Sequence, residues 1–272
     1  MTAGRYDGCV QTTTGDARVS RIAIAPVKGL ALQLPEEVEL ASSGVAENRR
    51  VHLIDRTGRL VNDKDERRLM LVSCRLDLEQ GTLALCFPEG DEVTGELALG
   101  EPNTTIFFGR PVDGHLLAGP WARALSDWIG RDLRLVVSEQ LGAGGDRGVQ
   151  AAVSIISRAS ISDVARAGGA GELDGRRFRM LFEIDGVGPY EEDAWIGRDV
   201  RIGDAVVRPN GNVGRCVITT CHPDTAERDF DTLRVLARHR KDVKANEPLP
   251  LGVVGEVVTP GRVRVGDRLQ LL

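Results

Sequence analysis

Aromatic residues are scarce in this chain, and an excess of positive charge is absent. Phe, Trp and Tyr together make up 4% of the 272 residues. Asp and Glu number 40 against 35 Lys and Arg, which leaves a formal net charge of −5. Proteins that bind nucleic acid usually combine a basic surface with aromatic side chains on which bases stack. The composition therefore indicates no nucleic-acid partner.

Paired cysteine spacings are absent as well. The chain has five cysteines, at positions 9, 74, 86, 216 and 221, and no C-x-x-C pair. An odd number without such spacing argues against a disulfide framework and against a structural zinc or iron–sulfur cage. The cysteines are therefore expected to be free thiols.

Long apolar runs are also absent. None approaches the roughly 20 residues that cross a bilayer. The polar segment 1–16 lacks the apolar core of a signal peptide, and we interpret it as a frayed tail. The sequence therefore predicts a cytoplasmic protein without a membrane partner.

Most of the sequence has the residue pattern of short strands separated by turns. Strands are expected at residues 19–24, 51–55, 69–78 with 82–87 as a hairpin, 93–99, 104–108, 112–117, 133–137, 152–156, 181–185, 200–207 and 213–220. A β pair is expected at the end of the chain, with residues 253–258 followed by 263–265, a turn at 266–267, and 269–272. Such spacing is typical of a barrel or sandwich. The prediction is a mainly β fold with α+β additions.

Three helices interrupt this pattern. Trp121, Leu125 and Ile129 form one apolar face between Pro120 and Gly130, which predicts a helix there. Further helices are expected from residue 160 to about 168 and over 231–240. A glycine cluster at 142–148 lacks the Lys-Ser/Thr of a P-loop, so we interpret it as a domain boundary or a lid.

The most informative motif is the pair Arg215-Cys216, followed by a β-branched run up to Thr220. A guanidinium favours the thiolate form of a neighbouring cysteine, and the thiolate is the form that attacks or binds metal. A buried, inert cysteine is the competing interpretation. Alternation along a strand would place Cys216 and Cys221 on opposite faces, which disfavours a zinc site with His222.

Several separated motifs resemble those of the MOSC family, in its two-part form with an N-terminal β-barrel domain. The motifs that carry the resemblance are Ala25-Pro26-Val27-Lys28-Gly29, Glu47-Asn48-Arg49-Arg50, Arg176-Arg177-Phe178-Arg179, Tyr190-Glu191-Glu192-Asp193-Ala194-Trp195, Arg215-Cys216 with Pro223-Asp224-Thr225, and Gly261-Arg262-Val263-Arg264-Val265-Gly266-Asp267. They run in one order from about residue 18 to the end. The resemblance implies a MOSC β-barrel domain over 121–272 and a smaller N-terminal β-barrel-like domain over 17–120, with the boundary between 118 and 150.

The resemblance also implies a pterin molybdenum cofactor and the reduction of N-hydroxylated compounds, as in the amidoxime-reducing relatives. Cys216 is the position that supplies sulfur to molybdenum in such relatives. The cationic contacts to the cofactor fall on Lys28, Arg49, Arg179 and Arg215, and Arg177 is a possible substitute for Arg179. Since the chain has no iron–sulfur cysteine set and no flavin fingerprint, a ferredoxin-like or cytochrome electron donor with its reductase is implied.

Some positions depart from the family pattern. Gly29 replaces a serine, Met180-Leu181 replaces a Pro-Asn pair, Asn48 replaces an aspartate, and Val254 replaces a late tyrosine. Two other hypotheses therefore stay open. The protein could carry the cofactor or its sulfur without redox chemistry, or it could have the fold and bind no cofactor.

Overall fold

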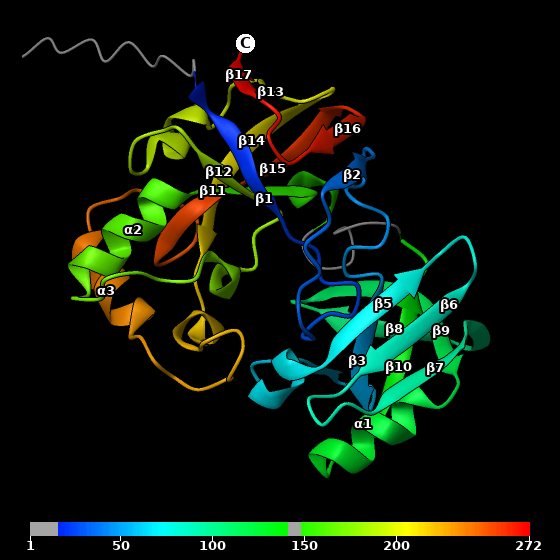
Figure 1. The fold of residues 1–272 in the computed structure, drawn as a ribbon. Coiled ribbons are helices and arrows are strands. Elements are labelled where there is room, and N and C mark those ends of the chain that lie inside the picture. Colours follow the sequence, from blue (N-terminus) through cyan, green and yellow to red (C-terminus); the bar gives the residue numbers. More distant parts are fainter. Residues whose placement is uncertain (1–15, 141–147) are drawn as a thin grey trace, which may run out of the picture.

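The computed structural model describes residues 16–140 and 148–272. The expectations for the N-terminal tail and for the glycine cluster lie outside these residues, apart from Asp16 and Gly148. The prediction of a mainly β fold with a few helices is confirmed. Figure 1 shows two lobes, one around the C-terminal strands and one around strands β3 to β10.

The first lobe is built on a seven-stranded sheet. Its strands, in spatial order, are β1 (Arg18–Ile22), β12 (Phe182–Asp185), β11 (Val153–Ser157), β15 (Pro250–Thr259), β14 (Ala205–Gly214), β13 (Val200–Ile202) and β17 (Leu269–Leu271). Main-chain hydrogen bonds from Val19 to Asp267 and from Leu269 to Ala17 join the first and last strands. The sheet is therefore a nearly closed barrel, with Phe182, Trp195 and Val207 among the buried residues of its core.

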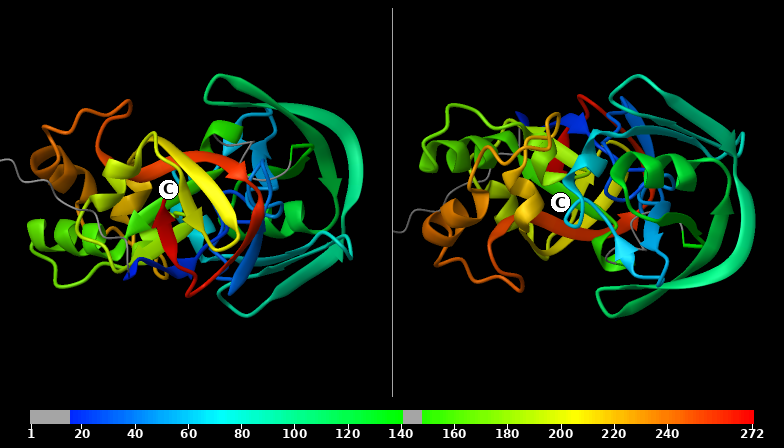
Figure 2. Two further views of the ribbon diagram at one scale, coloured as in Figure 1. Left: turned by 90° about the horizontal axis from the view of Figure 1, so that it is seen from above. Right: turned by 90° about the horizontal axis from the view of Figure 1, so that it is seen from below.

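The second lobe has its own hydrophobic core. A five-stranded sheet runs in the order β4 (Leu60–Val61), β3 (Val51–Asp55), β10 (Leu133–Ser138), β9 (Arg110–Ala118) and β8 (Ala98–Phe107), beside a three-stranded sheet of β5 (Ser73–Asp77), β6 (Thr82–Cys86) and β7 (Glu92–Glu96). Helix α1 (Trp121–Ile129) buries Trp121 and Leu125 against both sheets. Figure 2 shows these strands on the opposite side of the molecule from α2 and α3.

The remaining elements connect or flank the two lobes. A two-stranded sheet pairs β2 (Glu37–Leu40) with β16 (Gly261–Arg264). The other helices are α2 (Arg158–Ala167) and α3 (Thr232–His239), with short 3-10 helices η2 (Arg67–Leu71), η4 (Val149–Ala151), η5 (Gly175–Phe178), η6 (Glu191–Trp195) and η7 (Val217–Thr220). The expected helices at 121 and 231 are confirmed, and the helix expected from residue 160 begins two residues earlier. The proposed domain division at residue 120 stays a prediction.

Several expected strands are wrong in part. The expected strand 200–207 is interrupted at Gly203 and Asp204, which separate β13 from β14, and the expected strand 93–99 is interrupted at Leu97, which separates β7 from β8. The segment predicted to start a hairpin at Leu69 begins as η2, because the Glu66 side chain accepts a hydrogen bond from Arg68 N at 3.1 Å and caps a helical turn. The segment 213–220 leaves the sheet after Gly214 and continues as η7. The terminal strands do not pair with each other, since β16 pairs with β2 and β17 with β13.

The turn between β16 and β17 explains this last difference. Gly266 N donates to Val19 O at 2.8 Å, and Val19 N donates to Asp267 O at 2.9 Å. Because β1 occupies the turn, the two strands that flank it diverge into different sheets. The strands were predictable from their alternation, but their partners come from elsewhere in the chain.

Candidate functional site

A cavity of about 140 Å³ lies where the two lobes meet. Its charged lining residues come from both lobes: Lys28, Arg49, Asp63, Lys64, Arg179 and Arg215. Five cations therefore face one carboxylate, in a chain whose net charge is −5. Such a concentration of one sign in a cleft raises the local concentration of ligands of the opposite sign. The electrostatics of the cavity favour an anionic ligand.

Four of the predicted cationic residues line this cavity together with Cys216, whereas Arg177 does not. Lys28 follows β1 in the chain, and its main-chain N–H donates to Val51 O at 2.8 Å, which ties it to β3. Arg49 N donates in the same way to Ala25 O at 2.8 Å. Main-chain hydrogen bonds between the segment that contains Ala25 and Lys28 and the segment at the start of β3 thus position the two cationic residues that the N-terminal motifs predicted.

Arg49 and Arg179 approach each other from segments 130 residues apart. Arg49 Nη2 donates to Arg179 O at 3.5 Å, and Arg179 Nη2 donates to Leu30 O at 2.7 Å. Arg179 Nε lies 3.5 Å from the Asp63 carboxylate. Both arginines also have positive φ, 58° for Arg49 and 52° for Arg179. Left-handed backbone at a non-glycine residue costs energy and is concentrated at functional sites.

Arg215 is buried, and its guanidinium joins three segments of the chain. Nε donates to Leu251 O at 2.9 Å, Nη2 contacts the same carbonyl oxygen, and Nη1 donates to Phe178 O at 3.0 Å. The guanidinium also lies 5.3 Å from the centre of the Phe178 ring. Arg215 therefore lines the cavity and also holds β14, β15 and η5 together at its wall.

Cys216 does not lie on a strand, which corrects the sequence-based prediction. It is the residue that caps η7, with φ −120° and ψ 175°, and it is half-buried. Thr219 Oγ1 donates to Cys216 O at 2.9 Å, which closes the helical turn. The alternation argument that separated Cys216 from Cys221 therefore fails, and both pack in one small cluster with Met70 and Ile218.

No group of three metal-binding side chains occurs among residues 16–140 and 148–272.

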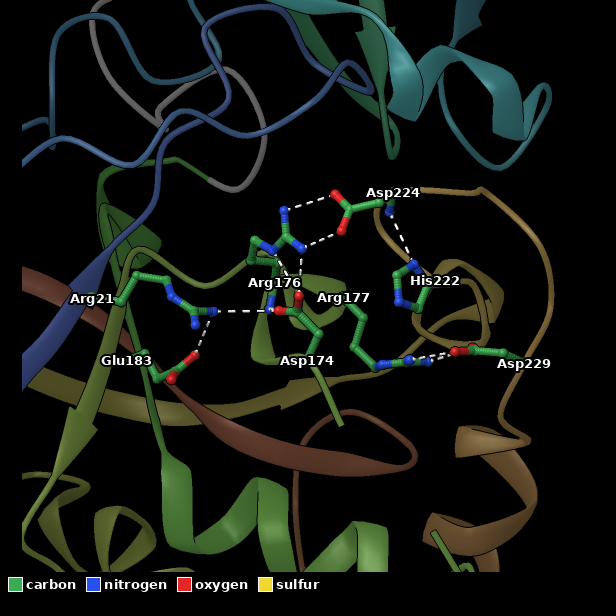
Figure 3. Close-up of polar contacts among 8 residues, drawn as sticks. All are labelled: Arg21, Asp174, Arg176, Arg177, Glu183, His222, Asp224 and Asp229. Carbon is green, nitrogen blue, oxygen red and sulfur yellow. Dashed lines mark hydrogen bonds and ion pairs between the residues drawn. The ribbon is translucent and has the colours of Figure 1, made fainter. Parts of the chain in front are cut away.

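Arg177 is buried away from the cavity lining and holds the loop that follows η7. It is 1% exposed, and its two terminal nitrogens donate to the Asp229 carboxylate, both at 2.9 Å. Figure 3 shows it beside Arg176, which bridges the carboxylates of Asp174 and Asp224. These carboxylates raise the pKa of Arg176 further above its usual value. The two adjacent arginines thus fasten the loop that contains His222, and neither lines the cavity.

The positions that depart from the family pattern are also brought together here. Gly29, Met180, Leu181 and Val254 all line the cavity. Gly29 has φ +90°, and a Cβ atom there would lie 2.9 Å from Asp63 N. Asn48 is buried and accepts a hydrogen bond from Ala25 N at 2.9 Å through its side chain. The residues that differ from the family pattern therefore lie in the cavity wall, and they change its shape and its polar groups relative to that pattern.

Asp63, Lys64 and Phe108 are among the lining residues that sequence reasoning missed. Asp63 and Lys64 belong to a polar turn after β4 that looks like any solvated turn. Phe108 follows Phe107 directly before Gly109, and an aromatic residue next to a turn glycine in a chain this poor in aromatics was the available signal. None of the three could be assigned to the site without the tertiary structure.

His52 lies next to the cavity wall, and its protonation should make the stability of the protein depend on pH. Burial and the charge of Lys28 lower the pKa of His52 from 6.5 to about 3. Between these values the unfolded chain binds a proton that the folded protein does not bind. The contribution of neutral His52 to the free energy of unfolding is therefore complete above pH 6.5. As the pH falls below 6.5, the protein loses this contribution by about 1.4 kcal/mol per pH unit.

This pH dependence can be measured by urea unfolding of the wild type and of His52→Gln between pH 7 and pH 4.5. The wild type is expected to lose stability more steeply than the variant, because glutamine does not titrate. The variant would be less stable at pH 7, since His52 Nε2 lies 2.9 Å from Thr105 Oγ1 in a buried contact. Parallel slopes for the two proteins would contradict the assignment.

Family models match nearly the whole chain. The model described as MOSC domain matches residues 140–270, and the model described as MOSC N-terminal beta barrel domain matches residues 16–128. Mitochondrial amidoxime-reducing component 1 of Xenopus laevis is 27% identical over 284 residues, which are 92% of this chain and 80% of that protein. The protein of the same name from Mus musculus is also 27% identical, over 93% of this chain and 82% of its own length.

Solved structures give a weaker likeness. The YUAD protein from Bacillus subtilis aligns over 93% of each chain, with a TM-score of 0.43 and 12% sequence identity. Among residues 16–140 and 148–272, no helix is long and apolar enough to cross a membrane.

Proposed function

Because the chain belongs to the MOSC family, with an N-terminal β-barrel domain before the MOSC domain, we propose that its cavity binds a pterin molybdenum cofactor. We further propose that the protein reduces N-hydroxylated compounds. A function related to the molybdenum cofactor is supported by the family and by the amidoxime-reducing relatives. We propose the substrate class, and the residues that act on it, on the basis of the cavity described above.

The residues of the cavity fit such a group. Lys28, Arg49, Arg179 and Arg215 offer the cationic contacts that a phosphate-bearing cofactor needs. Met180, Leu181 and Val254 provide an apolar surface for a flat heterocycle. Cys216 offers a soft sulfur ligand of the kind that thiophilic metals prefer. When bound, the cofactor supplies two-electron redox chemistry that no side chain of the cavity provides.

Each residue has a distinct role in this proposal. Cys216 would bind the metal through its sulfur, and Lys28 and Arg49 would neutralise the phosphate. Arg179 would do so as well, with its guanidinium oriented by Asp63 and by Leu30 O. Arg215 is proposed to shape the wall at least as much as to contact the cofactor, because its donors reach main-chain carbonyls. Arg177 is proposed as a positioning residue for the loop after η7.

The observation that carries the proposal is the place of Cys216. It shares one cavity with cationic residues from both lobes, although these residues lie as far apart in the sequence as Lys28 and Arg215. The electrons for the reduction must then come from outside, from a ferredoxin-like or cytochrome partner with its reductase. The proposal places the protein in the cytoplasm, where such partners and free thiols occur.

Metal and pterin analysis of the protein from a cofactor-competent host tests this proposal. The wild type is expected to contain near-stoichiometric molybdenum and to reduce benzamidoxime with an artificial electron donor. Cys216→Ala is expected to lose molybdenum and to show only background reduction, because the metal loses its protein ligand. Cys86→Ala is the matched control, since Cys86 lies on β6 and does not line the cavity.

Other outcomes separate the alternatives. Pterin that is retained in Cys216→Ala, with no reductase activity in the wild type, would favour a carrier of the cofactor or its sulfur. A protein that contains no pterin in any variant would refute both proposals and leave a MOSC fold without its cofactor.

A further inference from the structure

The tip of the β8–β9 hairpin places an exposed aromatic ring at the edge of the cavity. Phe108 is 65% exposed and is one of the lining residues. Because most of its ring is open to solvent, the residue contributes little to either hydrophobic core. Its neighbour Phe107, in contrast, is 2% exposed and packs edge-on against His52, with the ring centres 4.8 Å apart.

The backbone at this tip is unfavourable for phenylalanine. Phe107 pairs with Arg110, so Phe108 and Gly109 are the two central residues of the turn. Their φ angles are +49° and +83°. Two-residue hairpin turns with both φ angles positive prefer Asn-Gly or Gly-Gly, because a bulky side chain is strained at the first position. The turn conformation therefore favours asparagine at position 108. The presence of phenylalanine at this position needs an explanation other than folding.

Two cations lie close to the same ring. Lys64 Nζ is 5.2 Å and Lys28 Nζ is 5.9 Å from its centre, within the range of cation–π contacts. Lys64 comes from the turn after β4, and Lys28 is one of the proposed cofactor contacts. These contacts hold the tip at the cavity that the proposed function assigns to the cofactor, so the exposed ring forms part of the cavity lining.

We infer that Phe108 is a specificity-determining residue that stacks with the ring of a planar aromatic substrate, whose N-hydroxylated group enters the cavity. The inference rests on the proposed function for the identity of that group, and on the strained, exposed ring for the aromatic part. Ring stacking contributes beyond simple burial, and a flat aromatic substrate offers a matching face. An aliphatic N-hydroxylated substrate has no such face and gains nothing from the ring.

Equilibrium binding tests this inference without turnover. The full chain with its cofactor is titrated with benzamidoxime and with acetamidoxime in the absence of an electron donor. The wild type is expected to bind benzamidoxime about tenfold more tightly than acetamidoxime, as one aromatic stacking contact suggests. Phe108→Asn is expected to remove this preference while the midpoint of thermal unfolding stays the same or rises, because asparagine accepts the turn conformation.

Two matched variants sharpen the result. Phe108→Tyr keeps a ring and is expected to keep the preference. Ile106→Asn removes another exposed apolar side chain of the same hairpin, 59% exposed and outside the cavity lining, and is expected to leave both affinities unchanged.

Several outcomes would overturn the inference. A wild type without preference for the aromatic ligand would do so, as would an equal loss of affinity for both ligands in Phe108→Asn. A drop in pterin content in Phe108→Asn would assign the ring to the cofactor instead. A preference for the aromatic ligand in a protein that reduces neither compound would contradict the proposed function and leave the stacking role of Phe108 intact.

Discussion

Arg215→Met is expected to lower the free energy of unfolding by about 2–6 kcal/mol, the largest effect of a side-chain replacement at this site. The guanidinium donates to Leu251 O at 2.9 Å and to Phe178 O at 3.0 Å, and both of these residues are buried. Methionine fills similar space but donates no hydrogen bond. Two buried carbonyl groups then lose a donor, and each such loss costs about 1–3 kcal/mol. Urea unfolding followed by tryptophan fluorescence measures the difference.

Arg208→Met is the matched control on β14, the strand that Arg215 directly follows. Arg208 lies on β14, is 43% exposed in its side chain, and pairs with the Asp199 carboxylate at 2.6 and 3.0 Å. A pair in such contact with water is expected to change stability very little when it is removed. If both variants lost the same stability, the main-chain contacts of Arg215 would not be the source of the effect, and its proposed role at the cavity wall would be lost.

Gly29→Ser, which introduces the residue of the family pattern, is expected to destabilise this protein by about 2–4 kcal/mol. The first reason is the backbone, since φ is +90° at Gly29 and the left-handed region costs an L-residue about 1–2 kcal/mol. The second is space, because the new Cβ would lie 2.9 Å from Asp63 N and 3.1 Å from Asn62 Cα. Both atoms belong to the main chain, so the turn that carries Asp63 and Lys64 would have to move.

Gly58→Ser separates these two contributions. Gly58 has φ +82° and nothing within 4 Å of an added Cβ, so the substitution tests the backbone cost alone. Gly29→Ser is expected to be the more destabilising of the two in urea unfolding, and also to lower the cofactor content, because Gly29 lines the cavity. If the two variants lost the same free energy of unfolding, the turn at Asp63 would move at no cost in stability. In this protein the cavity wall is therefore expected to require glycine at position 29, because a side chain there would displace the turn that carries Asp63.

The segment after Arg215 shows why local pattern was insufficient near the site. The run Val217-Ile218-Thr219-Thr220 is rich in β-branched residues, which are typical of strands. The ladder ends at Gly214, however, and Thr219 O is bound by Thr232 Oγ1 at 2.7 Å and by Arg177 Nη1 at 3.3 Å. These partners come from α3 and η5. Tertiary hydrogen bonds therefore override the strand preference and produce the turn that carries Cys216.

The sequence showed which motifs contain cationic residues, but it did not show which of these residues reach the same cavity. The motif around Arg176 to Arg179 contains three arginines, and alternation alone could not say which of them faces a ligand. The structure turns Arg176 and Arg177 toward carboxylates of the loop after η7 and brings Arg179 to the cavity. The difference arises because Arg179 takes φ +52° at the end of η5, which redirects its side chain.

The sequence by itself determined the mainly β character, the positions of most strands and helices, and the residues that resemble the family's cofactor contacts. Alternation and helical spacing are local properties, so the chain carries them without its fold. Only the tertiary structure decided which strands pair, where Arg177 points, and that Phe108 and Lys64 share a cavity with Cys216. These depend on contacts between residues far apart in the chain, and no local pattern encodes which distant carbonyl, carboxylate or ring will be the partner.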